Sequence, residues 1–326
     1  SVLLWVVHFL VLRGVQTAAG INLVATLAKL LPLGAFVALA ALAFQLDTFR
    51  LDFSGLALGV PVWEQVKNTM LITLWVFIGV EGAVVVSARA RNKRDVGRAT
   101  LLAVLAALGV YLLVTLLSLG VVARPELAEI RNPSMAGLMV KMMGPWGEII
   151  IAAGLIVSVC GAYLSWTIMA AEVPFLASTH KAFPRIFARQ NAQGAPSASL
   201  WLTNICVQVC LVLIWLTGSD YNTLLTIASE MILVPYFLVG AFLLKIATRP
   251  IHKAVGIGAS IYGIWLLYAS GPMHLLLSVV LYAPGLLVFL YARKTHAHEN
   301  VLKRQEMALI GLLLVAAVPA TWMLMG

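Results

Sequence analysis

The sequence predicts an all-α integral membrane protein, and three observations lead to that fold class. Hydrophobic residues make up 62% of the 326 residues and charged residues only 11%, with a mean hydropathy of +0.98. Soluble domains carry about 25% charged residues. The apolar residues form runs of about 20 residues, the length that a helix needs to cross a bilayer. Basic clusters separate these runs. A single polytopic membrane domain over residues 1–326 is therefore expected.

The apolar runs predict a series of membrane helices. They lie near residues 1–12, 20–44, 69–88, 99–123, 148–175, 197–217, 221–244, 254–270, 273–291 and 307–325. The first run is apolar from its first residue and has about half the length of a span. We therefore expect the chain to be a fragment that starts inside a membrane helix.

The distribution of basic residues predicts the orientation. Sixteen of them lie at Arg13 and in the loops 89–98, 176–196, 245–253 and 293–306, whereas five lie in the alternate loops. Cytoplasmic loops of membrane proteins carry such an excess of Lys and Arg. We interpret the net charge of +9 as topology information, so a lipid bilayer is the expected partner and nucleic acid is not.

Features of other function classes are missing from the sequence. The cysteines Cys160, Cys206 and Cys210 lie inside apolar runs without metal-ligand spacing. We find no paired catalytic groups of the kind that an embedded enzyme needs, and no repeated ring of charges or carbonyl loops that would indicate a channel. We therefore expect no metal, no cofactor and no enzymatic activity. A channel or an embedded enzyme remains a distant alternative.

A carboxylate inside a predicted span is the main functional signal. Glu81 follows Gly79 and precedes Gly82 in TLWVFIGVEGAVVV, which starts at Thr73. An ionisable residue in a membrane helix is costly and marks a functional site by default; the alternative is a structural pair with a neighbouring helix. Trp75 and Glu81 would lie about 240° apart on an unbroken helix. They could share one cavity only if the backbone unwinds near Ile78 and Gly79, as in transporters with discontinuous helices.

Other polar and aromatic residues inside spans are weaker candidates. Trp166 would normally be core, but an indole face attracts a desolvated cation by about 2 kcal/mol. Glu230 is either a structural partner or part of the transport path, together with its neighbour Ser229. Lys29 either snorkels to the interface or exchanges a proton. Glu172, just before Pro174, is interpreted as a charge near a helix end.

These segments together resemble the amino acid–polyamine–organocation superfamily, and within it the basic amino acid/polyamine antiporters. The resemblance covers essentially the whole chain, and the wording around NPSMAGLM and GPWGEI is most similar to bacterial arginine/ornithine antiporters. The residues that carry it are LWVFIGVEGAVVVSARARNKRDVGRAT (74–100), YLSWTIMAAEVPF (163–175), FPRIFARQNAQGAPSASLW (183–201) and SEMILVPYFL (229–238).

The resemblance implies a five-plus-five inverted repeat of ten core helices with further C-terminal helices. Residues 1–12 would end the fourth helix and 69–88 would be the broken sixth, so the first three helices would be missing. Trp75 would be an aromatic gate, the backbone at Ile78 and Gly79 would meet the substrate amino group, and Trp166 would stack on a guanidinium. Glu81 and Tyr236 would belong to a distal gate.

The implied function is the exchange of L-arginine for L-ornithine by alternating access, in a multi-pass protein of the bacterial cytoplasmic membrane that could form a homodimer. Small cationic amino acids would be the substrates. Lys29 resembles a lysine that replaces sodium in proton-coupled relatives. Glu230 is an acid that arginine/agmatine relatives lack, which argues against simple arginine/agmatine exchange. A lysine/cadaverine antiporter, or another amino acid/amine exchanger, is the alternative.

Overall fold

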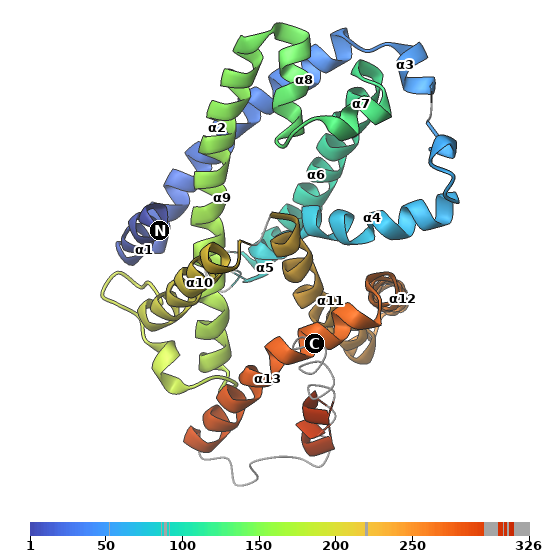
Figure 1. Cartoon of the computed structure of the whole chain (residues 1–326). Coiled ribbons are helices and arrows are strands. Elements are labelled where there is room, and N and C mark those ends of the chain that lie inside the picture. The colour runs from blue at the N-terminus through green and yellow to red at the C-terminus, as the bar shows by residue number, and fades with distance from the viewer. Residues whose placement is uncertain are drawn as a thin grey trace. The chain divides into compact units, whose positions relative to one another are not determined.

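The computed structural model describes residues 1–51, 53–85, 87, 90, 92–218, 221–296, 306–308, 310–311 and 313–315. Within these residues the regular structure is entirely helical (Figure 1). Most of the predicted span at 307–325, and part of the predicted cytoplasmic loops 89–98 and 293–306, lie outside the described residues. The chain forms two compact units, one of residues 1–62, 79–175 and 188–209 and the other of residues 63–78, 176–187 and 210–326.

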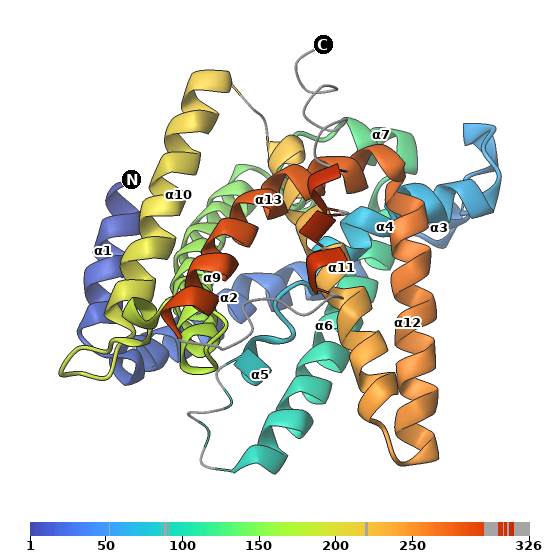
Figure 2. The same cartoon turned by 90° about the horizontal axis from the view of Figure 1, so that it is seen from below.

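The first unit contains most of the helices from the N-terminal half of the chain. They are α1 (Val2–Leu12), α2 (Val15–Leu42), α3 (Leu46–Arg50), η1 (Leu56–Leu58), α5 (Gly82–Val85), α6 (Lys93–Val121), α7 (Arg124–Glu129), α8 (Ser134–Met143), most of α9 (Pro145–Thr179) and the first part of α10 (Ser197–Thr217). Figure 2 shows α1 beside α10, and a buried cluster that includes Val7, Leu164 and Leu200 joins these two helices to α9.

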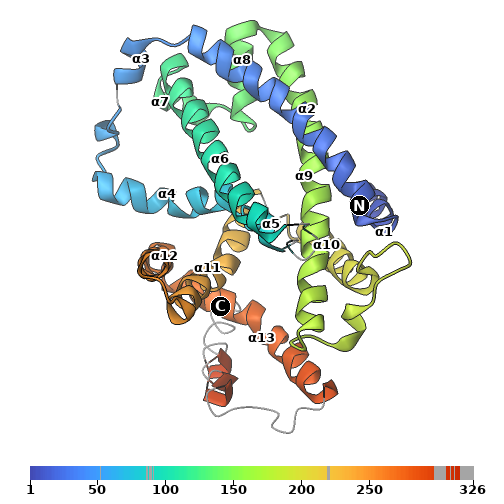
Figure 3. The same ribbon diagram turned by 180° about the vertical axis from the view of Figure 1, so that it is seen from behind.

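A second core of the first unit lies around the C-terminal half of α2. Phe36 and Met139 are fully buried there and join α2 to α8 (Figure 3). The short helices α7 and α8 are connected by an ion pair between Glu126 and Lys141. The described loop between α6 and α9 is therefore a packed, helical structure rather than an extended connection.

The second unit is built from α4 (Val62–Phe77), α11 (Tyr221–Ile246), α12 (Pro250–Ser270) and α13 (Pro272–Thr295), with most of the 3-10 turn η3 (Arg185–Ala188). The helices α11 and α12 lie side by side (Figure 2). A Cβ at Gly256 would come within 2.8 Å of the Leu244 backbone, and one at Gly263 within 2.9 Å of the Phe237 backbone. Such small residues allow two membrane helices to approach closely.

Four of the described helices are long and apolar enough to cross a membrane: Asp95–Val121, Pro145–Thr179, Ser197–Thr217 and Ala228–Ile246. The helix α9 has 35 residues and is therefore roughly 50 Å long, which exceeds the hydrocarbon thickness of about 30 Å. Pro174 lies inside this helix rather than at its end. The interpretation of Glu172 as an end charge is wrong, because its side chain is only 1% exposed inside α9.

Candidate functional site

The predicted break of the sixth helix is present in the structure. Helix α4 ends at Phe77 and α5 begins at Gly82, with turns between them. The Ile78 amide still donates to the carbonyls of Leu74 and Trp75, at 3.2 Å each, and the Gly82 amide donates to the Gly79 carbonyl at 3.0 Å. Gly79 has φ +104°, a conformation that side-chain-bearing residues rarely adopt. The backbone therefore leaves the helix at Gly79.

The Glu81 carboxylate accepts a hydrogen bond from the backbone within this break. The Gly79 amide donates to Oε2 of Glu81 at 2.9 Å, and the carbonyl of Glu81 accepts from the amides of Val84 and Val85 at 2.8 and 3.1 Å. A helix interruption frees backbone donors, which lipid cannot satisfy. The side chain of Glu81 thus serves the local backbone, which neither sequence-based alternative for this residue had foreseen.

The broken segment lies against one face of α9. A Cβ placed on Gly79 would come within 3.1 Å of Cζ2 of Trp166, and one on Gly82 within 2.6 Å of Sδ of Met169. Trp166 and Met169 are three residues apart and hence share a helix face. The absence of side chains at both glycines lets the break contact this face directly.

Trp166 is 43% exposed although it contacts the break. A tryptophan in a packed core has little free surface, whereas this ring keeps part of its surface open beside a carboxylate and an interrupted backbone. Gly79, Glu81 and Trp166 are therefore brought together within the first unit. They supply a ring face, a negative charge and polar backbone groups, and the ring face and the negative charge both attract cations.

Five of the other sequence-predicted residues, Trp75, Ile78, Ser229, Glu230 and Tyr236, belong to the second unit. Tyr236 packs against the buried residues Leu74 and Leu233, which join α4 to α11. Trp75 and Ile78 are half-buried on and after α4. On α11, Ser229 is fully buried and its hydroxyl donates to the Leu225 carbonyl at 2.8 Å, while Glu230 is only 3% exposed. The structure thus groups Trp75, Ile78 and Tyr236 on two helices that share a core.

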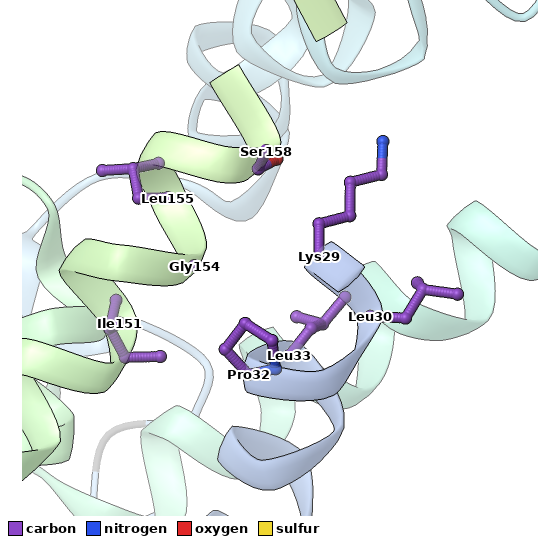
Figure 4. A pocket seen from close by; sticks show the side chains of 8 residues that line it. All are labelled: Lys29, Leu30, Pro32, Leu33, Ile151, Gly154, Leu155 and Ser158. Carbon is purple, nitrogen blue, oxygen red and sulfur yellow. The ribbon is translucent and has the colours of Figure 1, made fainter. Parts of the chain in front are cut away.

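Lys29 lines a separate pocket of the first unit, between α2 and α9 (Figure 4). The cavity measures about 230 Å³. A Cβ on Gly154 would come within 2.3 Å of Cγ of Pro32, so the two helices approach each other closely at these residues. The lysine side chain extends from α2 along this gap, with Ser158 on the facing helix. Lys29 is half-buried.

Sequence reasoning missed three features of the described structure. Met169 was not singled out, because its contact with Gly82 depends on which helix faces the break. Glu172 is buried, and the small and apolar residues around it in the sequence were a signal of that burial. His8 is fully buried and its Nδ1 lies 2.7 Å from Nδ2 of Asn204, and this pair spans α1 and α10.

A helix interrupted beside polar groups, in an apolar helical protein, is typical of secondary transporters, and comparison with known proteins leads to the same class. The amino acid permease family matches residues 1–314. A protein of Escherichia coli K12, named provisionally as an arginine/ornithine antiporter, is 91% identical over all 326 residues, which cover 71% of that relative.

Two less similar relatives are also named as antiporters. The arginine/ornithine antiporter of Pseudomonas aeruginosa is 44% identical over 90% of this chain and 65% of its own length. The arginine/agmatine antiporter of Chlamydia caviae is 41% identical over 92% of this chain and 65% of its own length. The chain therefore belongs to the amino acid permease family, an all-helical family of multi-pass membrane transporters rather than enzymes.

Proposed function

We propose that the protein is an antiporter that exchanges arginine for ornithine across the bacterial cytoplasmic membrane. The observation that carries the proposal is the half-exposed ring of Trp166 beside the broken backbone at Gly79 and the carboxylate of Glu81. An aromatic face attracts a guanidinium or an ammonium. The names of the relatives from Escherichia coli and Pseudomonas aeruginosa point to the same pair of substrates.

In this proposal each predicted residue has a role in alternating access. Trp166 stacks on the cationic side chain, and the backbone at Ile78 and Gly79 meets the amino group of the substrate. Trp75 gates the site on one side, and Glu81 and Tyr236 gate it on the other. Ser229, Glu230 and Lys29 line the path of the substrate or of a coupled proton. The broken helices rock against a scaffold around the site.

The orientation and assembly are part of the same proposal. The loops 89–98, 176–196, 245–253 and 293–306 face the cytoplasm, because they carry most of the basic residues. The protein is inserted as a multi-pass protein in the lipid bilayer and assembles as a homodimer. Single cysteines introduced into these loops and into the alternate loops, tested with a membrane-impermeant thiol reagent on intact cells, distinguish the two sides.

Uptake by proteoliposomes tests the substrate pair. Vesicles loaded with ornithine should take up labelled arginine, whereas vesicles without amino acid should not. Parallel vesicles loaded with agmatine, lysine or cadaverine separate the proposed pair from other exchanges. Rapid uptake with cadaverine and little with ornithine would favour a lysine/cadaverine antiporter instead. Uptake into all vesicles regardless of content would contradict obligatory exchange.

A matched tryptophan controls the assignment of the site. Trp215 on α10 is 81% exposed, so Trp215→Leu removes an equally large ring from an exposed position. It should leave arginine exchange within about twofold, while Trp166→Leu reduces it clearly. An equal reduction by both variants would mean that loss of a tryptophan, rather than loss of this site, impairs the protein.

A further inference from the structure

The face of α4 that points toward α12 carries a regular series of contact residues. Trp63, Lys67, Met70 and Leu74 are spaced by four, three and four residues, the spacing that places side chains on one helix face. This spacing covers most of the helix from Val62 to Phe77. The last residue of the series, Leu74, precedes Trp75 by one position and Ile78 by four. The proposed function assigns roles to both Trp75 and Ile78.

Each of these four residues contacts α12 or the core beside it. The rings of Trp63 and Trp265 lie 4.4 Å apart between centroids, and Nζ of Lys67 lies 5.3 Å from the centroid of the Tyr268 ring. The indole N–H of Trp265 donates to Sδ of Met70 at 3.1 Å. Leu74 is 3% exposed and shares a buried cluster with Leu266. We call the set Trp63, Lys67, Met70, Trp265 and Tyr268 the α4–α12 clasp.

The clasp combines several interactions along the helix. The ring pair stabilises the interface beyond the area that it buries, and the ammonium over the Tyr268 ring adds an electrostatic attraction. The indole–thioether bond links the two helices between these contacts, and the buried leucines lie at the end nearest the break. The α12 partners all fall within residues 265–268, so the contacts hold α4 at one turn of α12.

The regular helix that carries the clasp residues ends at Phe77, and a turn follows it. Residues 63–78 belong to one compact unit and residues 79–175 to the other, so the unit boundary on this segment falls between Ile78 and Gly79. Gly79 has a positive φ, and the turn from Ile78 to Glu81 lacks the continuous hydrogen bonding of a helix. A hinge is formed by a few such residues that absorb changes in φ and ψ.

We propose that α4 and α12 move as one rigid element during transport, and that the clasp residues position Trp75 and Ile78 by holding α4 on α12. The conformational change is absorbed at Ile78–Glu81, not at the interface between α4 and α12. The inference rests on the proposed function, since it requires a transport cycle. None of the clasp residues needs to touch the substrate, so they are positioning residues.

Reversible crosslinking tests whether the two helices move together. The native cysteines Cys160, Cys206 and Cys210 are first replaced by alanine, and Lys67→Cys is combined with Tyr268→Cys. A short bifunctional thiosulfonate should join the two introduced cysteines in the native transporter. Arginine/ornithine exchange by the crosslinked protein should stay within about threefold of the same protein before crosslinking and after reduction.

The outcomes separate this inference from the proposed function. A fall of more than threefold that reduction reverses would overturn it, because α4 would then have to move relative to α12. Failure to crosslink the folded protein would also overturn it. Absence of exchange by the folded cysteine-free protein in which Lys67 and Tyr268 are intact would instead count against the proposed function. The single-cysteine proteins treated with the same reagent control for modification without crosslinking.

A second measurement does not depend on cysteines. Trp265→Phe keeps a ring but removes the N–H donor, and Met70→Leu removes the acceptor. Each should lower the maximal exchange rate severalfold with little change in arginine affinity, and the double variant should lose no more than either single one, since both remove the same bond. Trp215→Phe is the matched control. Additive losses, or losses only in arginine affinity, would contradict a positioning role.

Discussion

Gly79 has two independent reasons to lack a side chain. Its φ of +104° costs other residues about 1–3 kcal/mol, and a Cβ there would lie within 3.1 Å of the Trp166 ring. We expect Gly79→Ala to slow exchange at least tenfold, because both the turn and the ring must shift. Gly109→Ala on α6 is the control, since open space surrounds that position and alanine favours a helix. Equal exchange rates for the two variants would refute this.

Glu81 combines a structural bond with a proposed gating role, and two substitutions separate them. Glu81→Gln keeps an oxygen that can accept from the Gly79 amide but removes the charge. Glu81→Ala removes the acceptor, which costs about 1–3 kcal/mol if the amide stays unsatisfied.

We therefore expect the melting temperature to fall for Glu81→Ala and to stay nearly unchanged for Glu81→Gln. Exchange should slow in both variants. Wild-type exchange in the Gln variant would leave Glu81 with a structural role alone.

Trp166 tests whether a ring face binds the substrate. The attraction between a cation and an aromatic face is about 0.5–1 kcal/mol at exposed sites and about 2 kcal/mol when desolvated. We expect Trp166→Leu to weaken arginine binding by about 1–2 kcal/mol, and Trp166→Phe to cost less, because Phe keeps a smaller ring. Binding calorimetry measures both. Equal losses for Leu and Phe would favour a packing role.

At the scale of single residues, the sequence predicted the break but not its chemistry. Trp75 and Glu81 could face one cavity only if the backbone unwinds between them, and the glycines beside Glu81 favoured such a break. The bond from Gly79 to Glu81 could not be predicted, because it depends on the turn that the freed backbone adopts. The contact of Gly82 with Met169 depends on the facing helix, which periodicity along one helix does not specify.

At the scale of elements, a buried polar pair joins α1 to α10. His8 and Asn204 are 0% and 2% exposed, and Nδ2 of Asn204 lies 2.7 Å from Nδ1 of His8. The rings of Trp5, Phe9 and Trp201 surround the imidazole, with Trp201 at 4.3 Å between centroids. An unpaired polar group in this position would be costly, since neither water nor lipid satisfies it.

Asn204→Leu should therefore destabilise the protein. Side-chain hydrogen bonds between membrane helices contribute about 0.6 kcal/mol on average, and a buried group left unpaired costs about 1–3 kcal/mol. We expect a loss of about 1–2 kcal/mol, measured by thermal unfolding in detergent, and partial recovery when His8→Leu is added. Thr203→Val is the control, because the Thr203 hydroxyl bonds within its own helix. A further loss in the double variant would contradict the pairing.

The helices themselves could be predicted from hydrophobicity more readily than their lengths. Helix α10 occupies Ser197–Thr217, the range that the apolar run predicts. Helix α9 extends at both ends beyond its predicted range. At its C-terminal end it continues past Pro174, which removes one hydrogen bond without ending the helix. The short helices α3, α7 and α8 lie in segments where apolar and polar residues mix, so they do not stand out as apolar spans.

At the scale of the whole molecule, hydropathy predicts a bilayer protein but not its two compact units. Their boundary passes between Ile78 and Gly79, within a single predicted span. Length and apolarity identify a span in a sequence, and neither of them indicates where such a boundary falls. Contacts such as those of the α4–α12 clasp decide the grouping, and they join residues almost two hundred positions apart. Only the glycines near Glu81 indicated that this span would divide.

The charge moved per transport cycle discriminates between exchange pairs for the whole protein. Arginine and ornithine each carry one net positive charge, so their exchange moves none, whereas agmatine carries two. A potential of 100 mV acts on each transported charge with about 2.3 kcal/mol, equivalent to about 50-fold in an equilibrium gradient.

We expect arginine/ornithine exchange in proteoliposomes to be unchanged by a potassium diffusion potential of either sign. Exchange of external arginine for internal agmatine, if it occurs, should speed up when the outside is made negative. A potential-dependent arginine/ornithine gradient would show that a proton or another ion accompanies the exchange, and Lys29, at the wall of its pocket between α2 and α9, would then be the first residue to replace.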